Sequence, residues 1–99
     1  MKNMFMVEVS LPKGLSPQLV SKIPHQRMHI NEMMQRGTIS SYTLAMNRSK
    51  LWVCVSADNP QEVDDVISDF PIADFITYKI NELAFHDTAH SLIHEFSLN

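Results

Sequence analysis

The stretch TISSYTLAMNRSKLWVCVS, residues 38–56, decides the fold class of this chain. Residues 38–46 are rich in residues that favour strands, and residues 50–56 alternate between two faces, so both segments are predicted to be strands. Asn47-Arg48-Ser49 between them is a turn sequence, and the three segments together predict a β-hairpin. One face of the second strand carries Leu51, Val53 and Val55, and the other carries Trp52, Cys54 and Ser56.

A long helix is predicted before the hairpin. Ser16-Pro17 is typical of an N-cap followed by proline at the first helical position, and a helical pattern runs from there to Arg36. Gly37 ends this helix as a C-cap residue would. Pro24 lies inside the segment and lacks a backbone N–H, so we expect a kink or a restart there. The apolar stripe consists of Ile23, Ile30, Met33 and Met34.

The remaining segments are predicted to be two strands and a second helix. Met4 to Leu11 alternates with period 2 and predicts a first strand. Asp58-Asn59-Pro60 caps a second helix, which Phe70-Pro71 stops. Ile72 to Asn81 is predicted as the fourth strand.

The order βαββαβ predicts a ferredoxin-like α+β domain over residues 1–83, with both helices on one face of an antiparallel sheet. Several strands carry large apolar residues on both faces, Trp52 and Phe75 among them. The second face therefore needs a cover, and the simplest cover is the sheet of another subunit. We expect a homodimer or a larger oligomer.

Residues 84–99 form a separate tail. Phe85, Ala89, Leu92, Ile93 and Phe96 lie at helical spacing, which predicts an amphipathic helix from Ala84 to Phe96. Its apolar stripe has no obvious place on a monomer with two helices and one sheet. We therefore expect the tail helix to dock on a partner subunit.

Composition excludes several classes of function. The net charge is −3 and the eight Lys and Arg residues are scattered, so the basic stripe that nucleic acid binding requires is absent. No apolar run is long enough to predict a membrane span, and no signal-peptide layout begins the chain. The single cysteine, Cys54, permits no internal disulfide, which fits a reducing cytoplasm.

Several short motifs resemble one known family. They are Leu11-Pro12 after the first strand, Arg36-Gly37-Thr38, the hairpin, Asp69-Phe70-Pro71, Tyr78-Lys79-Ile80, Leu83 and His86. Their order and joint spacing, from Phe5 to His86, resemble the muconolactone Δ-isomerase family. The resemblance implies a dimeric α/β barrel in which two sheets pack face to face. It also implies a small-molecule pocket between sheet and helices.

The resemblance implies a reaction as well. The family moves a proton across an unsaturated lactone in the breakdown of aromatic compounds, which requires a base at one carbon and a returned proton at another. As we align it, the first helix of the family carries acidic residues where this chain has Gln26 and Met28. Neither side chain here can carry a proton. His86 lies where the family also has a histidine, which makes it the candidate catalytic residue.

The other histidines favour neither metal nor catalysis. His25 and His29 are four residues apart on the first helix, and His86, His90 and His94 are each four apart on the tail. This spacing suits zinc, but no thiolate or acidic cluster completes a site. A helical wheel instead places His25, His29, Glu32 and Arg36 on a solvated face. We predict no metal and no cofactor.

Five further residues are candidates for binding a small molecule. Tyr42, Trp52 and Tyr78 lie on predicted strands, where an aromatic ring with a polar tip can line a pocket or an interface. Gln26 lies at one of the family's helix positions. Its neighbour Arg27 lies near the edge of the apolar stripe, where it can pair with a carboxylate or remain exposed.

Three functions remain open from the sequence. The first is an isomerase-like enzyme acting on a small lactone or enol, with His86 as the proton carrier. The second is a non-catalytic binding or assembly module on the same barrel. The third is a monooxygenase-type barrel, whose substrate-assisted chemistry leaves little trace in a sequence. Fold alone does not decide among them.

Overall fold

The computed structural model describes residues 2–89. The elements in chain order are β1 (Asn3–Ser10), α1 (Pro17–Gln35), β2 (Ile39–Leu44), β3 (Lys50–Ala57), α2 (Pro60–Ser68), the 3₁₀ helix η1 (Ala73–Phe75) and β4 (Thr77–Glu82). This order and a single four-stranded antiparallel sheet confirm the predicted ferredoxin-like α+β fold.

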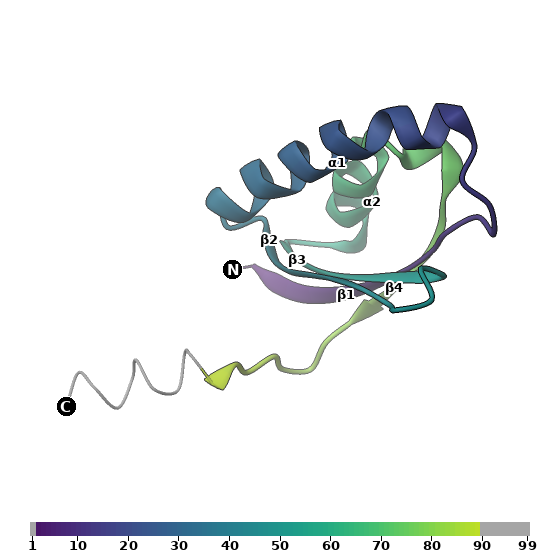
Figure 1. Cartoon of the computed structure of the whole chain (residues 1–99). Helices are drawn as coiled ribbons and strands as arrows, with labels where there is room; N and C mark the ends of the chain where they lie inside the picture. The colour runs from purple at the N-terminus through teal and green to yellow at the C-terminus, as the bar shows by residue number, and fades with distance from the viewer. Residues whose placement is uncertain (1, 90–99) are drawn as a thin grey trace.

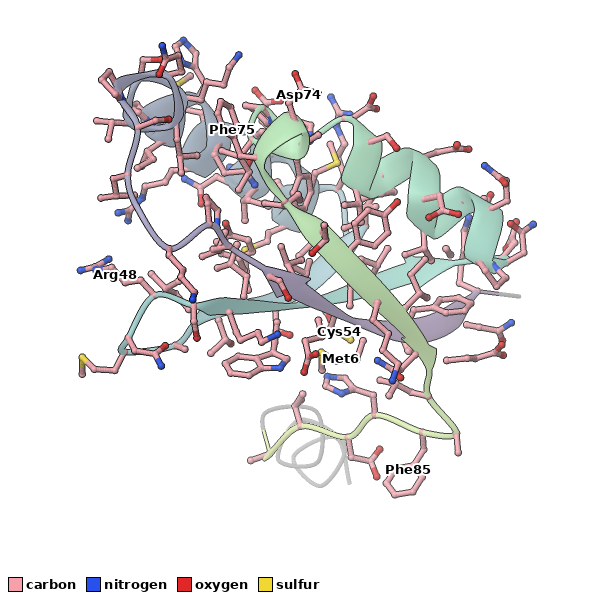
Figure 2. The ribbon with its side chains drawn as sticks, turned by 90° about the vertical axis from the view of Figure 1, so that its right-hand side faces the viewer. Met6, Arg48, Cys54, Asp74, Phe75 and Phe85 are labelled. Carbon is pink, nitrogen blue, oxygen red and sulfur yellow. The ribbon has the colours of Figure 1, made fainter. Side chains whose placement is uncertain are left out.

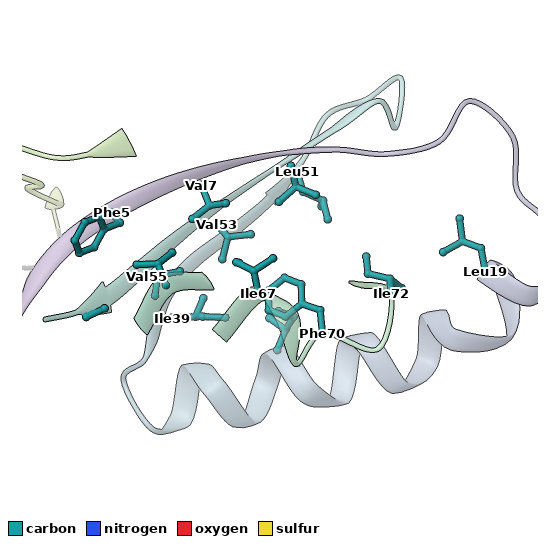
Figure 3. Close-up of a cluster of buried hydrophobic side chains, with 14 residues drawn as sticks. Phe5, Val7, Leu19, Ile39, Leu51, Val53, Val55, Ile67, Phe70 and Ile72 are labelled. Carbon is teal, nitrogen blue, oxygen red and sulfur yellow. The ribbon is translucent and has the colours of Figure 1, made fainter. Parts of the chain in front are cut away.

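The sheet has the strand order β2-β3-β1-β4, and both helices lie on one of its faces (Figure 1). β1 is paired on both sides, so that Val7 lies between Val53 of β3 and Ile80 of β4. This register points the alternate residues of β1 and β3 toward the helices. The core that results is shown in part in Figure 3 and consists of Phe5, Val7, Val9, Leu19, Ile30, Ile39, Leu51, Val53, Val55, Ala57, Val63, Ile67, Phe70 and Ile72.

Local side-chain contacts fix the ends of both helices as the sequence predicted. The Ser16 hydroxyl accepts a hydrogen bond from the Leu19 N–H at 3.1 Å, and Asn59 Oδ1 accepts one from the Glu62 N–H at 2.9 Å. Gly37 follows α1 with a φ of 78°, a conformation that glycine adopts without strain. The helix does not restart at Pro24, because α1 continues through that residue.

The fourth strand is shorter than predicted. Ile72 turns into the core and is 4% exposed, and the Phe75 N–H donates to the Ile72 carbonyl at 2.9 Å in η1. The strand begins only at Thr77. The prediction was wrong because the apolar alternation from Ile72 onward arises from a turn packed on the core. Phe75 therefore does not add an apolar side chain to the outer face of the sheet.

The chain leaves the sheet after β4 on the side opposite the helices (Figure 1). The Leu83 N–H donates to the Met4 carbonyl at 2.9 Å, and residues 84–88 form neither helix nor strand. The tail helix therefore does not begin at Ala84 as predicted. The part of that predicted helix after Ala89 lies outside the described residues.

The outer face of the sheet, opposite the helices, carries its own small apolar patch. Met6 pairs in register with Cys54, and Figure 2 shows both side chains on this face. Cys54 is fully buried, whereas Met6 and its neighbour Trp52 are half-buried. Within residues 2–89, no helix combines the length and the hydropathy that a membrane crossing requires.

Truncating a buried core side chain should lower the stability of the fold strongly. Ile67 is fully buried between α2 and the sheet, so Ile67→Ala should lower the free energy of unfolding by about 2–5 kcal/mol. Urea unfolding followed by circular dichroism measures this loss. Val20→Ala is the matched control, since Val20 is 46% exposed and its truncation should cost no more than about 0.5 kcal/mol. Equal losses at the two positions would contradict the packing described here.

Candidate functional site

A cleft of roughly 900 Å³ lies between α1, the segment that joins β1 to α1, and the end of the β2–β3 hairpin. Its buried inner wall is formed by Leu19, Ile30, Leu51 and Ile72. Its exposed rim includes Leu15, Ile23, Met34 and Leu44. A concave, mostly apolar site of this size is typical of sites for small organic molecules.

The buried face of α1 differs in part from the prediction. The helix buries Leu19, Gln26 and Ile30, while Ile23 and Met34 of the predicted stripe are 38% and 43% exposed and line the cleft. Ile30 is buried and Met33 packs against the core, as the predicted stripe requires. The buried face is turned slightly from that stripe, because the residue that the helix buries at its middle, Gln26, is polar. The apolar side chains that would have faced the core are thereby left at the cleft rim.

Within residues 2–89, Gln26 is the only polar or charged residue that is buried, at 3% exposure. Its Oε1 accepts a hydrogen bond from the Ile72 N–H at 3.3 Å, which ties α1 to the turn after α2. Its Nε2 has no hydrogen-bond partner in the described part of the chain. The amide oxygen of Gln26 is therefore hydrogen-bonded within the fold, whereas the amide nitrogen has no partner among the described residues.

Tyr42 projects from β2 into the same cleft. Burial raises the pKa of its phenol above the ordinary value of 10.0, and the nearby Gln26 amide and Arg27 guanidinium oppose that shift. At neutral pH the phenol is therefore protonated, and its O–H is available as a donor to a ligand. Gln26, Arg27 and Tyr42, three residues singled out in the sequence, are thus brought together.

The charged side chains that line the cleft are all positive. Lys13, Arg27 and Arg48 line it, and no Asp, Glu or His is among the described residues that do so. Arg48 projects from the end of the hairpin (Figure 2), where its φ of 61° is unusual for a side-chain-bearing residue. In a chain of net charge −3, this arrangement gives the cleft a local preference for anions.

The other candidate residues lie elsewhere. Trp52 is half-buried on the outer face of the sheet. The Tyr78 hydroxyl donates to Asp64 Oδ1 of α2 at 2.7 Å, and this bond raises the pKa of Tyr78. His86 is half-buried on the segment that leaves the sheet opposite the helices. None of these three residues lines the cleft beside Gln26.

His29 was predicted to lie on a solvated face, but it is half-buried. The His29 ring is half-buried and meets the Phe70 ring edge-on, with the ring centroids 5.9 Å apart. The prediction for His29 was wrong because Phe70, at the end of α2, packs under this face of α1. His25, Glu32 and Arg36 are exposed as predicted.

The sequence reasoning missed two of the three cations at the cleft, Lys13 and Arg48. Both lie in connecting segments, and the backbone hydrogen bond from the Leu11 N–H to the Ser49 carbonyl at 3.0 Å holds those segments together. The basic residue at the centre of a hairpin turn was the available signal, since Asn or Gly is usual there. Across residues 2–89, no group of three or more His, Cys, Asp and Glu side chains is arranged to hold a metal ion.

Comparison with known proteins identifies the family. Residues 1–89 match the family model described as muconolactone delta-isomerase. No curated protein gives a significant match. The matched region includes every helix and strand of the fold and the residues that form the cleft. The chain therefore belongs to the muconolactone delta-isomerase family.

Proposed function

We propose that this protein binds a small carboxylate with an apolar body in the cleft between α1 and the hairpin. The observation that carries the proposal is the set of three cations, Lys13, Arg27 and Arg48, on an apolar cleft that no described acidic side chain lines. The buried wall accommodates the body of the ligand, and guanidinium groups at the cleft pair with a carboxylate. A lactone acid or an enol acid of aromatic catabolism fits this description.

Catalysis by the family's proton shift is a weaker fit. The cleft offers no carboxylate or imidazole from the described residues that line it, and burial keeps Tyr42 protonated. Gln26 and Met28 stand where we align the acids of the family, and neither can carry a proton. We propose that the chain acts mainly as a binding module on the isomerase fold.

Isomerisation is the second candidate, and family membership favours it. His86 is its proposed proton carrier, because an imidazole titrates near neutral pH. In one chain the segment that carries His86 lies on the far side of the sheet from the helices (Figure 1). This candidate therefore requires that a partner subunit contribute His86 to the cleft.

Self-association is part of the proposal. Trp52 and Met6 are half-buried on the outer face, beside the fully buried Cys54, and a second sheet packed there would cover them. Such an apolar patch on a small domain favours pairing with a second copy. We propose that the outer faces of two sheets meet in a homodimer, and that residues 84–99 add contacts to it.

The dimer is tested by light scattering. The wild-type protein should give a mass above the 11.4 kDa of one chain at micromolar concentration. Trp52→Glu should shift it toward the monomer, because it buries a charge in the apolar contact. Val20→Glu, on the exposed side of α1, should leave the mass unchanged. A wild-type particle of monomer mass would contradict the proposal.

Ligand binding is tested by calorimetry with muconolactone and its methyl ester. The acid should bind more tightly, and Arg27→Met should weaken the acid by about 10–100-fold, the loss expected for a charge-assisted hydrogen bond. The ester should be nearly insensitive to that change. Arg36→Met is the control, since Arg36 lies outside the cleft. Equal affinities for the acid and the ester would contradict the proposal.

Catalysis is tested by following muconolactone in heavy water for deuterium uptake. The wild type should exchange slowly or not at all, and Gln26→Glu should increase exchange, since a positioned general base contributes ~10²–10⁴ in rate. Glutamate keeps the oxygen that accepts from the Ile72 N–H, so the fold should survive. Robust wild-type turnover would instead favour the isomerase, and its loss in His86→Ala would assign the proton carrier.

A further inference from the structure

The Gln26 amide has a defined orientation. The two ends of a glutamine amide are difficult to distinguish by shape, but the Ile72 N–H is a donor and must face the oxygen. The Nε2 group, with its two N–H donors, therefore points elsewhere. It is buried without a hydrogen-bond partner in the described part of the chain, and a buried donor without an acceptor is unfavourable.

A second donor lies beside it. Tyr42 lines the same cleft as Gln26, and the Gln26 amide lies near enough to oppose the rise in the pKa of the phenol, although no hydrogen bond joins the two groups. The phenol O–H and the amide N–H groups thus gather at the buried end of the cleft. The exposed cations Lys13 and Arg48 lie at its rim.

No carboxylate or imidazole lies at this site among the described residues. Gln26 Oε1 is already engaged by Ile72, and no Asp, Glu or His lines the cleft among the residues described. A neutral hydroxyl entering here would bring a proton that no side-chain carboxylate or imidazole could accept. An oxygen that only accepts, and above all one that carries negative charge, satisfies the donors.

We propose that Gln26 Nε2 and the Tyr42 hydroxyl form a binding site for a phenolate or enolate oxygen at the buried end of the cleft. This inference rests on the proposed function, because it makes this oxygen the second polar end of a ligand whose carboxylate lies at the cations. The ligand is then an apolar acid with an ionisable enol or phenol at the end opposite its carboxylate. Binding favours the ionised form of that group.

The probe is 4-hydroxy-3-nitrobenzoate, which carries a carboxylate and a coloured phenol at opposite ends. Its phenol is titrated by absorbance, free and with saturating protein. The wild type should lower the pKa of the bound phenol by ~1 unit or more, because donors and a nearby cation favour the phenolate. A bound phenol whose pKa is equal to or above that of the free probe overturns the inference.

Two variants separate the donors from the general positive charge. Tyr42→Phe removes one donor, and Gln26→Glu replaces the amide nitrogen with an acceptor while retaining the contact with Ile72. Both should raise the pKa of the bound phenol toward the free value. Gln61→Glu, on the exposed surface of α2, is the matched control and should leave the shift intact. Melting temperatures close to the wild type exclude unfolding as the cause.

The outcomes distinguish this inference from the proposed function. A probe that binds through its carboxylate, competes with muconolactone and shows no pKa shift retains the function and overturns the donor site. A shift that persists in both Tyr42→Phe and Gln26→Glu also overturns it, and assigns the effect to the cations. Failure of the probe and of muconolactone to bind at all overturns both proposals.

Discussion

The pairing of β1 between β3 and β4 is the constraint on which the rest of the structure depends. Val7 lies opposite Val53 on one side and Ile80 on the other, so all three side chains point at the helices. A slip of one residue would turn the alternating valines of β1 to the outer face and bring Met6 and Glu8 inward. The cost of burying Glu8 excludes that register. The helix-side core and the outer patch are therefore fixed together.

The cleft follows from how α1 lies on this sheet. The helix has 19 residues, and it presents to the core a face that includes Gln26. A polar side chain is tolerated there because its oxygen satisfies the backbone N–H of Ile72, which would otherwise be buried without an acceptor. The same rotation leaves Ile23 and Met34 exposed at the rim. The cleft is thus bordered by a polar contact that ties α1 to the turn after α2.

The sequence predicted what depends on local pattern. The order of elements, the hairpin and the helix caps at Ser16 and Asn59 follow from period, turn residues and capping chemistry, and the structure has them all. It did not predict that Ile72 begins a turn, because strand and turn share the same apolar pattern when both pack on a core. Nor did it predict the rotation of α1, because hydropathy cannot show that Gln26 has a buried backbone partner.

The sequence predicted the candidate site only in part. The family resemblance singled out Gln26 and Arg27, and the predicted strand singled out Tyr42. Only the fold shows that the three residues line one cleft. The cations Lys13 and Arg48 come from loops, whose positions depend on tertiary contacts such as the hydrogen bond between Leu11 and Ser49. Loop residues carry little periodic signal, so sequence reasoning is weakest where binding sites are most often built.

Gln26 also shows how binding and catalysis can separate on one fold. Glutamate and glutamine both present an oxygen to the Ile72 N–H, so the contact that orients α1 is the same for an acid as for its amide. They differ at the second atom, where the acid can take and return a proton and the amide can only donate hydrogen bonds. An exchange of acid for amide at this position therefore keeps the contact with the Ile72 N–H. It would turn a proton carrier into a donor for an anionic oxygen, which accords with the binding site that we propose in this cationic cleft without a described acid.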